Sequence, residues 1–391
     1  MGDFNFDNIR PYTEKEAKDA ILRITQQPEF QTILDHIFDK SIHHILIEKT
    51  RKAKNIHEFQ KFFMHPLVEK ILKETSLGLS TSGFEKLEDH KSHLLIANHR
   101  DITLDSSILA KVFIDHNLKT PEVTWGDNLM VSPFVVDFGK INRMITVFRE
   151  GSPRELLINS KRLSAYIRNK IINGESSVWI AQSKGRTKDG NDKTDVGVLR
   201  MLSLEGSEDI LTRIKLLNII PVSISFEWEP CDSLKLKELY ISRNKRYEKE
   251  PTEDLNSIIG GIFGWKGHVN LSVGDPLNDK ISAEFEHMNS KEILQKVAAL
   301  IDESIYSNYK LWPSNYLAYD LLKNTSRYSE YYTDETKNEM SKRLKSVLKK
   351  TGGVIKDLDI PEATKIFYSI YANPVINKMK ITSPLEASSA H

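Results

Sequence analysis

The segment from residue 94 to residue 109 places a histidine beside two carboxylates, directly after a short apolar run. His99 follows the run, with Asp101 and Asp105 after it. A carboxylate can hold one ring nitrogen of a histidine while the other nitrogen takes a proton from a hydroxyl, which is general base catalysis. The alternative is a surface histidine with solvated acids around it and Asp105 near the positive end of a helix.

Cations follow two further apolar runs. Arg149 stands after residues 144–148, and Lys184, Arg186 and Lys188 surround Gly185 after residues 178–182. Arginine and lysine suit phosphate oxygens, and glycine allows a tight turn that exposes backbone N–H groups. Each loop alone is more often a solvated loop, but residues 140–215 hold 15 Lys+Arg against 9 Asp+Glu. This excess favours an anionic substrate.

Short apolar runs alternate with helical stretches from about residue 90, which predicts an α/β fold with a mixed central sheet flanked by helices. In such a sheet, ligands bind at the carboxyl ends of strands. We predict a helical N-terminal unit over 1–80, an α/β domain over 81–285 and a helical C-terminal extension packed on it over 286–391. The small residues at 76–83 indicate a turn between the first two units.

Three segments leave a structural and a functional interpretation open. The N-terminal helices, opened by a capping box at Thr13 and Glu16, are expected to cover an apolar edge of the sheet. The apolar run that contains Pro221 and Val222 is either sheet core or a wall facing an acyl chain. The basic amphipathic run over 333–350 either lies on an anionic membrane or packs on its own domain.

The composition is that of a globular enzyme. The chain has 391 residues, 39% of them hydrophobic and 28% charged, with a formal net charge of +1. A balanced charge gives no global attraction to nucleic acid. The single cysteine, Cys231, cannot form an internal disulfide. The sequence shows neither an export signal nor a membrane-spanning run. We therefore expect a cytoplasmic protein that is at most peripheral to the membrane. A hydrolase is disfavoured because no Gly-x-Ser-x-Gly motif is present.

Four blocks in this order resemble the glycerolipid acyltransferase superfamily, which includes glycerol-3-phosphate and 1-acylglycerol-3-phosphate acyltransferases. They are Asn98-His99 with a following Asp, residues 147–149, the Gly185-Arg186 loop and residues 219–224. The third block, residues 179–188, is most similar to the soluble plastid-type glycerol-3-phosphate acyltransferases. The resemblance covers roughly residues 90–280.

The resemblance implies transfer of a fatty acyl group from acyl-CoA or acyl-carrier protein to the hydroxyl of glycerol 3-phosphate, with no metal and no cofactor besides the acyl donor. His99 would be the general base and Asp105 its orienting carboxylate, while Arg149, Lys184, Arg186 and Lys188 would bind the phosphate. The same chemistry on 1-acylglycerol 3-phosphate (lysophosphatidate) is an alternative. A non-catalytic lipid-binding or acyl-carrier-binding protein of the same fold is another.

Two features depart from the superfamily pattern. Five residues separate His99 from Asp105 instead of four, so that either the turn holds one extra residue or Asp101 orients the ring. Ser183 and Lys184 stand before Gly185, where many members have a glutamate. The plastid-type loop also lacks that glutamate, which favours a subgroup over an inactive enzyme.

Overall fold

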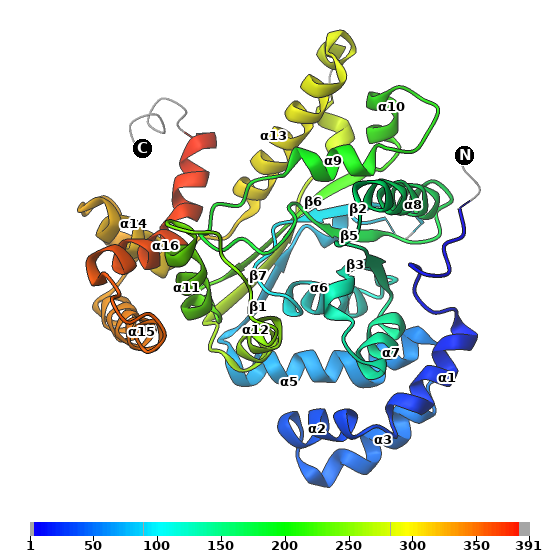
Figure 1. Ribbon diagram of the computed structural model, residues 1–391, viewed down its shortest axis with the longest axis horizontal. Coiled ribbons are helices and arrows are strands. Elements are labelled where there is room, and N and C mark those ends of the chain that lie inside the picture. Colours follow the sequence, from blue (N-terminus) through cyan, green and yellow to red (C-terminus); the bar gives the residue numbers. More distant parts are fainter. Residues whose placement is uncertain (1–3, 89, 282, 383–391) are drawn as a thin grey trace.

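The computed structural model describes residues 4–88, 90–281 and 283–382, and it has the expected α/β fold with one mixed sheet (Figure 1). Seven strands pair in the order β1-β7-β6-β2-β5-β3-β4. Their bounds are Gly78–Ser82 (β1), Leu94–Ala97 (β2), Glu122–Gly126 (β3), Met144–Val147 (β4), Val178–Ala181 (β5), Ile219–Phe226 (β6) and His268–Val273 (β7). Strands β2 to β6 are parallel, and β7 is antiparallel to β6. The carboxyl ends of the five parallel strands therefore meet at one edge of the sheet.

Helices cover both faces of this sheet. On one face lie α1 (Glu14–Ile24), α2 (Pro28–Ile37), α3 (His43–Arg51), α4 (Ile56–Phe59), α5 (His65–Thr75), α6 (Leu104–Asp115) and α7 (Pro133–Ile141). On the other lie α8 (Pro153–Ile172), α9 (Val196–Leu202), α10 (Ile210–Lys215) and α13 (Ser290–Asn308). Side chains alternate between the two faces, so that Leu95 packs into the first layer and Leu94 and Ile96 into the second. The N-terminal helices thus cover a face of the sheet rather than its edge.

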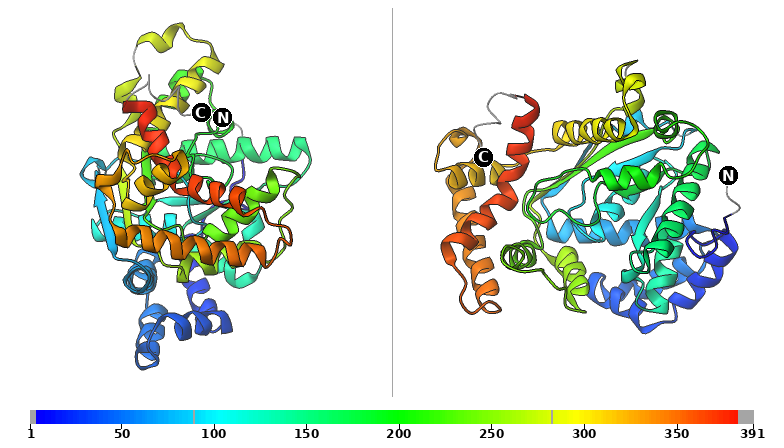
Figure 2. Two further views of the ribbon diagram at one scale, coloured as in Figure 1. Left: turned by 90° about the vertical axis from the view of Figure 1, so that its left-hand side faces the viewer. Right: turned by 45° about the horizontal axis from the view of Figure 1, so that its top comes forward.

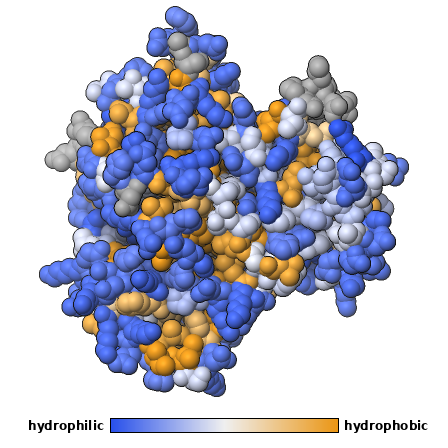
Figure 3. All heavy atoms as spheres, turned by 180° about the vertical axis from the view of Figure 1, so that it is seen from behind, coloured by the Kyte–Doolittle hydropathy of each residue, from blue (hydrophilic) through white to orange (hydrophobic). Residues whose placement is uncertain are grey.

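The C-terminal helices pack together beside the sheet (Figure 2). They are α14 (Pro313–Lys323), α15 (Asp334–Gly352) and α16 (Ile360–Thr382), and they share a hydrophobic cluster with α11 (Asp232–Ser242). Seen from behind, hydrophobic side chains gather near the middle of the molecule, between these helices and the rest of the chain (Figure 3).

Helix α15 uses its apolar side within the protein. Met340 and Val347 are buried, and Leu344 and Leu348 pack against the same cluster. Of the two interpretations of residues 333–350, packing on the chain's own domain is confirmed. Membrane contact through the apolar side of this helix is wrong, because that side is already covered.

One local prediction is also wrong. The small residues at 76–83 were expected to form a turn, but they contain the strand β1, which pairs with β7. The side-chain amide of Asn270 in β7 donates hydrogen bonds to the carbonyl and hydroxyl oxygens of Ser80. This strand crosses the predicted boundary at residue 80, and the division into three units stays a prediction. Helix α16 continues through Pro374. Residues 383–391 of the predicted extension lie outside the described part of the chain.

The remaining helical segments are short. They are α12 (Glu253–Phe263), a π-helical turn (Gln60–Met64) between α4 and α5, and short 3-10 turns at 40–42, 84–86, 127–129, 277–280, 283–287 and 329–331. The capping box at the start of α1 is formed as predicted by Thr13 and Glu16. Within the described ranges, no helix combines the length and the apolar content needed to cross a bilayer.

Candidate active site

The turn after β2 pairs His99 with Asp105. The Asp105 carboxylate accepts a hydrogen bond from Nδ1 of His99 at 2.8 Å, and the same oxygen accepts the backbone N–H groups of Arg100 at 2.6 Å and Asp101 at 3.0 Å. The carboxylate is buried in the first turn of α6, where the helix dipole favours negative charge. The turn therefore fixes both the carboxylate and the imidazole that it holds.

Asp101 has a different role. Its carboxylate accepts the backbone N–H groups of Thr103 and Leu104 at 3.0 and 2.9 Å, which are free donors at the start of α6. Burial, with a further contribution from the charge of Asp105, raises the pKa of the Asp101 carboxyl above its usual range. Of the two carboxylates that the sequence left open, Asp105 is the one that contacts the ring. Asp101 as the orienting residue is wrong.

The base of this turn is clamped to the sheet. Asn98 donates to the carbonyl of Ile224 in β6 at 3.0 Å and accepts its N–H at 2.8 Å. The edge of the His99 ring faces Trp179, with ring centroids 5.7 Å apart. Among the described residues, His99 makes a side-chain hydrogen bond through Nδ1 alone, so Nε2 is available to a substrate.

His99 opens into a cavity of about 230 Å³ together with all four predicted phosphate ligands, Arg149, Lys184, Arg186 and Lys188. The rest of the lining consists of Ile102, Thr124, Trp125, Gly126, Asn128, Leu129, Trp179, Gly185, Lys249 and Asp254. Strand ends and loops far apart in the sequence thus bring one imidazole and several cations to the same hollow. His99 and Arg186 therefore line one common cavity.

Arg186 has an unused hydrogen-bond donor. Its Nη2 donates to Oγ of Ser257 in α12 at 3.1 Å, whereas Nη1 is buried and has no partner within the described residues. A buried guanidinium N–H without an acceptor is unfavourable, and an anionic ligand would satisfy it. Arg186 thus keeps one hydrogen-bond donor for which the described residues supply no acceptor.

The other cations differ in how they are held. Lys188 forms an ion pair with Glu238 at 3.0 Å, and burial lowers its pKa. Arg149 and Lys184 have exposed side chains at the mouth of the cavity. We therefore expect Arg186 and Lys188 to define the anion position and Arg149 and Lys184 to strengthen the local positive potential.

Sequence reasoning missed the part of the wall formed by α12 and the loop after β3. Lys249 and Asp254 form an ion pair at 2.6 Å, and Asn128 donates to the other oxygen of Asp254 at 3.2 Å. The signal in the sequence was weak, because these polar residues stand in ordinary charged stretches. Only the packing of α12 against the cation loop at 183–192 brings them to the site.

Pro221 and Val222, predicted to face an acyl chain, lie in the fully buried β6 next to β2. Val222 packs in the core on the face covered by the N-terminal helices. Neither residue belongs to the lining described for the His99 cavity. The sheet-core interpretation accounts for both.

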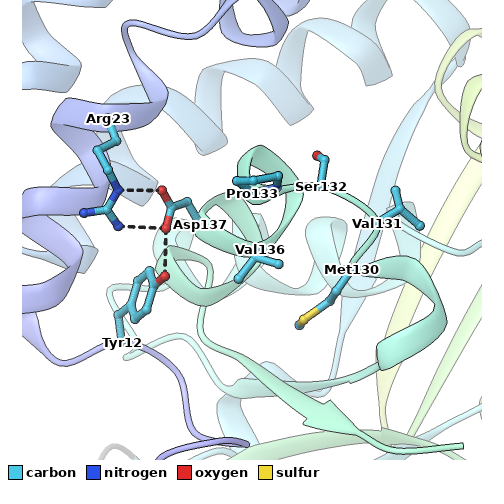
Figure 4. Close-up of a pocket in the computed structure, with 8 residues that line it drawn as sticks. All are labelled: Tyr12, Arg23, Met130, Val131, Ser132, Pro133, Val136 and Asp137. Atoms are coloured by element: carbon cyan, nitrogen blue, oxygen red, sulfur yellow. Dashed lines mark hydrogen bonds and ion pairs between the residues drawn. The ribbon is translucent and has the colours of Figure 1, made fainter. Parts of the chain in front are cut away.

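A second cavity, of about 500 Å³, lies on the other side of the loop after β3 (Figure 4). Its polar groups are already paired with one another. Asp137 accepts two hydrogen bonds from Arg23, at 2.8 and 2.9 Å, and one from Tyr12 at 2.7 Å. Met130, Val131, Pro133 and Val136 supply the apolar part of the wall. Because its charges are mutually satisfied, this cavity offers less for catalysis than the smaller one.

A buried ion network lies behind the turn that holds His99 and Asp105. Arg100 is fully buried and contacts Asp192 at 2.6 Å and Glu229 at 3.2 Å. Glu229 also forms an ion pair with Lys235. The network continues to the C-terminal helices, because Arg343 of α15 donates a hydrogen bond to the backbone oxygen of Glu229. Arg343 also pairs with Asp232 at 2.5 Å, and Tyr371 of α16 donates to the same carboxylate at 2.8 Å. Three cations thus balance three carboxylates, and all of these residues except the partly exposed Arg343 are buried.

Helix α16 also supports the cation loop directly. Asn373 donates to the backbone oxygen of Asp189 at 2.7 Å. Pro374 has no N–H group, so it cannot donate to the carbonyl of Ile370 one turn earlier in the helix. Gly190 lies against that carbonyl so closely that a Cβ added to Gly190 would be 2.3 Å from the carbonyl oxygen. Gly190 has a φ of +80°, which favours glycine for a second reason. The C-terminal helices are therefore part of what shapes the cavity.

Comparisons with known proteins give a limited likeness. No protein-family model matches the chain, and no curated protein matches it in sequence. Among solved structures, it is similar to the 1-acyl-sn-glycerophosphate acyltransferase PlsC from Thermotoga maritima, with 14% identity and a TM-score of 0.38. The match covers 73% of this chain and 97% of the PlsC chain. The α/β class itself follows from the sheet and the helices of this chain.

Proposed function

We propose that this protein is an acyltransferase that moves a fatty acyl group from a thioester donor to the hydroxyl of a phosphorylated glycerol. The observation that carries the proposal is the shared cavity of His99, with a free Nε2, and Arg186, with an unpartnered Nη1. A hydroxyl nucleophile needs a base, and its phosphate needs cations a few ångströms away. The cavity offers both.

In the proposed reaction, Nε2 of His99 takes the proton of the acceptor hydroxyl as its oxygen attacks the thioester carbonyl. The new C–O bond forms, the C–S bond breaks, and the proton on His99 passes to the leaving thiolate. Asp105 holds Nδ1 and stabilises the imidazolium that forms during the step. Arg186 and Lys188 hold the phosphate and so fix the distance from the hydroxyl to His99.

Glycerol 3-phosphate and lysophosphatidate remain two candidate acceptors, because both present the same phosphate. Acyl-CoA and acyl-carrier protein are the candidate donors. The cavity of about 230 Å³ is small and rich in cations, which suits the phosphorylated glycerol portion of either acceptor. The fatty chain of the donor or of lysophosphatidate would extend beyond it.

The test offers radiolabelled acyl-CoA and acyl-carrier protein to the purified protein with glycerol 3-phosphate, lysophosphatidate or unphosphorylated glycerol. We expect labelled product with a phosphorylated acceptor and a loss of about 10²–10⁴-fold in turnover for His99→Ala. His65→Ala is the matched control, since His65 pairs with Asp115 at the far end of α6 at 2.6 Å. No product with any acceptor would favour the non-catalytic binding protein, and wild-type turnover of His99→Ala would refute the assigned base.

A further inference from the structure

Helix α12 carries an exposed apolar stripe. Leu255, Ile259 and Phe263 are spaced four residues apart and lie on one side of the helix, and Trp265 follows its end. Each of these four side chains keeps between 41% and 57% of its surface exposed. The helix lies at the surface next to α5 (Figure 1). An exposed apolar stripe that includes tryptophan and phenylalanine is typical of a contact surface.

The opposite side of α12 is fixed to the candidate active site, so the helix cannot turn its stripe inward. Ser257 is buried and accepts the hydrogen bond from Arg186. Gly261 lies against Asp101 so closely that an added Cβ would be 2.1 Å from its carboxylate oxygen. The exposure of the stripe is thus a consequence of how the cavity is built.

Basic residues precede α12 in the chain, and others line the cavity next to it. Lys245 and Arg246 are exposed in the segment that leads into α12, where Glu248 and Glu250 are exposed as well. Neither cation has an ion pair among the residues that the structure describes. Val131, with 80% of its surface exposed, lies in the loop that Asn128 ties to the first turn of α12. The exposed cations Arg149 and Lys184 lie at the mouth of the cavity. Apolar side chains with cations nearby fit a surface that is apolar inside and anionic outside.

We propose that the α12 stripe docks this protein on the surface of an anionic phospholipid bilayer. The stripe would enter the boundary between headgroups and acyl chains, with Trp265 at the level of the headgroups, and Lys245 and Arg246 would contact anionic lipid. A second copy of the chain is the competing occupant, which would form a dimer in solution.

The first experiment is sedimentation of the full-length protein with vesicles of phosphatidylcholine alone or mixed with phosphatidylglycerol. We expect binding to the anionic vesicles, a loss of at least tenfold for the double variant Ile259→Glu/Phe263→Glu, and a loss of up to about 30-fold for Lys245→Ala/Arg246→Ala. Leu321→Glu/Val354→Glu is the matched control, because these exposed apolar residues belong to the C-terminal helical region. It should bind like the wild type.

Trp265 gives a second, independent readout. The other tryptophans, Trp125, Trp179, Trp228 and Trp312, are buried, so a vesicle-induced blue shift of the emission would come from Trp265. Trp265→Phe should still sediment with anionic vesicles but should lose the shift. This variant keeps an aromatic side chain and leaves the cavity residues unchanged.

Either of two measurements could overturn the proposal. The first is sedimentation, if the wild-type protein stays in the supernatant with both vesicle types or if the Ile259→Glu/Phe263→Glu variant binds as well as the wild type. The second is analytical ultracentrifugation, if it shows a dimer that the same variant converts to a monomer, without vesicle binding. Neither measurement depends on catalysis, so its result is independent of whether the proposed acyltransferase activity is found.

Discussion

The substitution Asp105→Asn tests the candidate catalytic pair with the least change in shape. The amide oxygen can replace the carboxylate oxygen that accepts from His99, Arg100 and Asp101. The amide nitrogen then takes the place of the other carboxylate oxygen, which has no hydrogen-bond partner among the described residues. The geometry of the turn is retained and the negative charge is removed.

The magnitude follows from the distance between the two groups. At an effective dielectric constant of about 20, opposite unit charges 2.8 Å apart attract by about 6 kcal/mol, which is an upper estimate for the stabilisation of the imidazolium in the transition state. The amide dipole keeps part of it. We therefore expect turnover to fall by about 10²–10⁴-fold, with little change in the KM for the phosphorylated acceptor. The buried amide N–H₂ group lacks an acceptor and should cost about 1–3 kcal/mol of folding stability.

The assay measures initial rates with saturating acyl thioester and varied acceptor, at a temperature where circular dichroism shows the variant to be folded. Asp115→Asn is the matched control, because Asp115 lies on the same helix and also contacts a histidine, His65. It should retain wild-type turnover. Comparable turnover for Asp105→Asn and the wild type, or an equal loss in both variants, would refute the assigned role of Asp105.

Three further predictions concern binding, stability and pH. Arg186→Ala removes the donor offered to the phosphate, so the KM for the acceptor should rise by about 10- to 100-fold while kcat changes less; an unchanged KM would contradict the phosphate assignment. Arg343→Met leaves Asp232 without its cation and should lower the free energy of unfolding, measured by urea titration, by about 3–5 kcal/mol. Lys342 is the exposed neighbour of Arg343, so the control variant Lys342→Met should change the free energy of unfolding by less than about 0.5 kcal/mol. Burial lowers the pKa of Lys266 from an ordinary 10.5 to about 8. Above pH 8, Lys266 releases its proton in the folded protein but keeps it in the unfolded chain. The free energy of unfolding of the wild type should therefore rise by about 2 kcal/mol relative to that of Lys266→Met between pH 7 and pH 10. Parallel profiles of unfolding free energy against pH for the two proteins would disprove this.

The elements that carry the site were predictable because their signals are local. Leu94, Leu95 and Ile96 form a continuous apolar run, which is the pattern of a strand buried on both faces. The run ends at polar residues, and a parallel arrangement places the ends of β2, β4 and β5 at one edge. That is why the sequence could place His99, Arg149 and Arg186 at strand ends of one sheet.

Other elements depend on partners far away in the chain. The strand β1 has small, half-exposed side chains that resemble a turn, and it becomes a strand because β7 supplies its hydrogen bonds. The run over 333–350 has the same amphipathic pattern whether it faces a bilayer or a protein core. Only α11, α14 and α16 decide that its apolar side is covered.

Local sequence patterns predict the α/β class, the histidine with two nearby carboxylates and the cation loops, because residue type and periodicity are properties of neighbouring positions. Tertiary structure decided that Asp105 holds His99 while Asp101 caps α6, that α12 completes the cavity through Ser257, and that Arg100 is neutralised from behind. These outcomes depend on distances between segments remote in sequence. Such distances are set by the packing of the whole sheet and its helices, which no local pattern encodes.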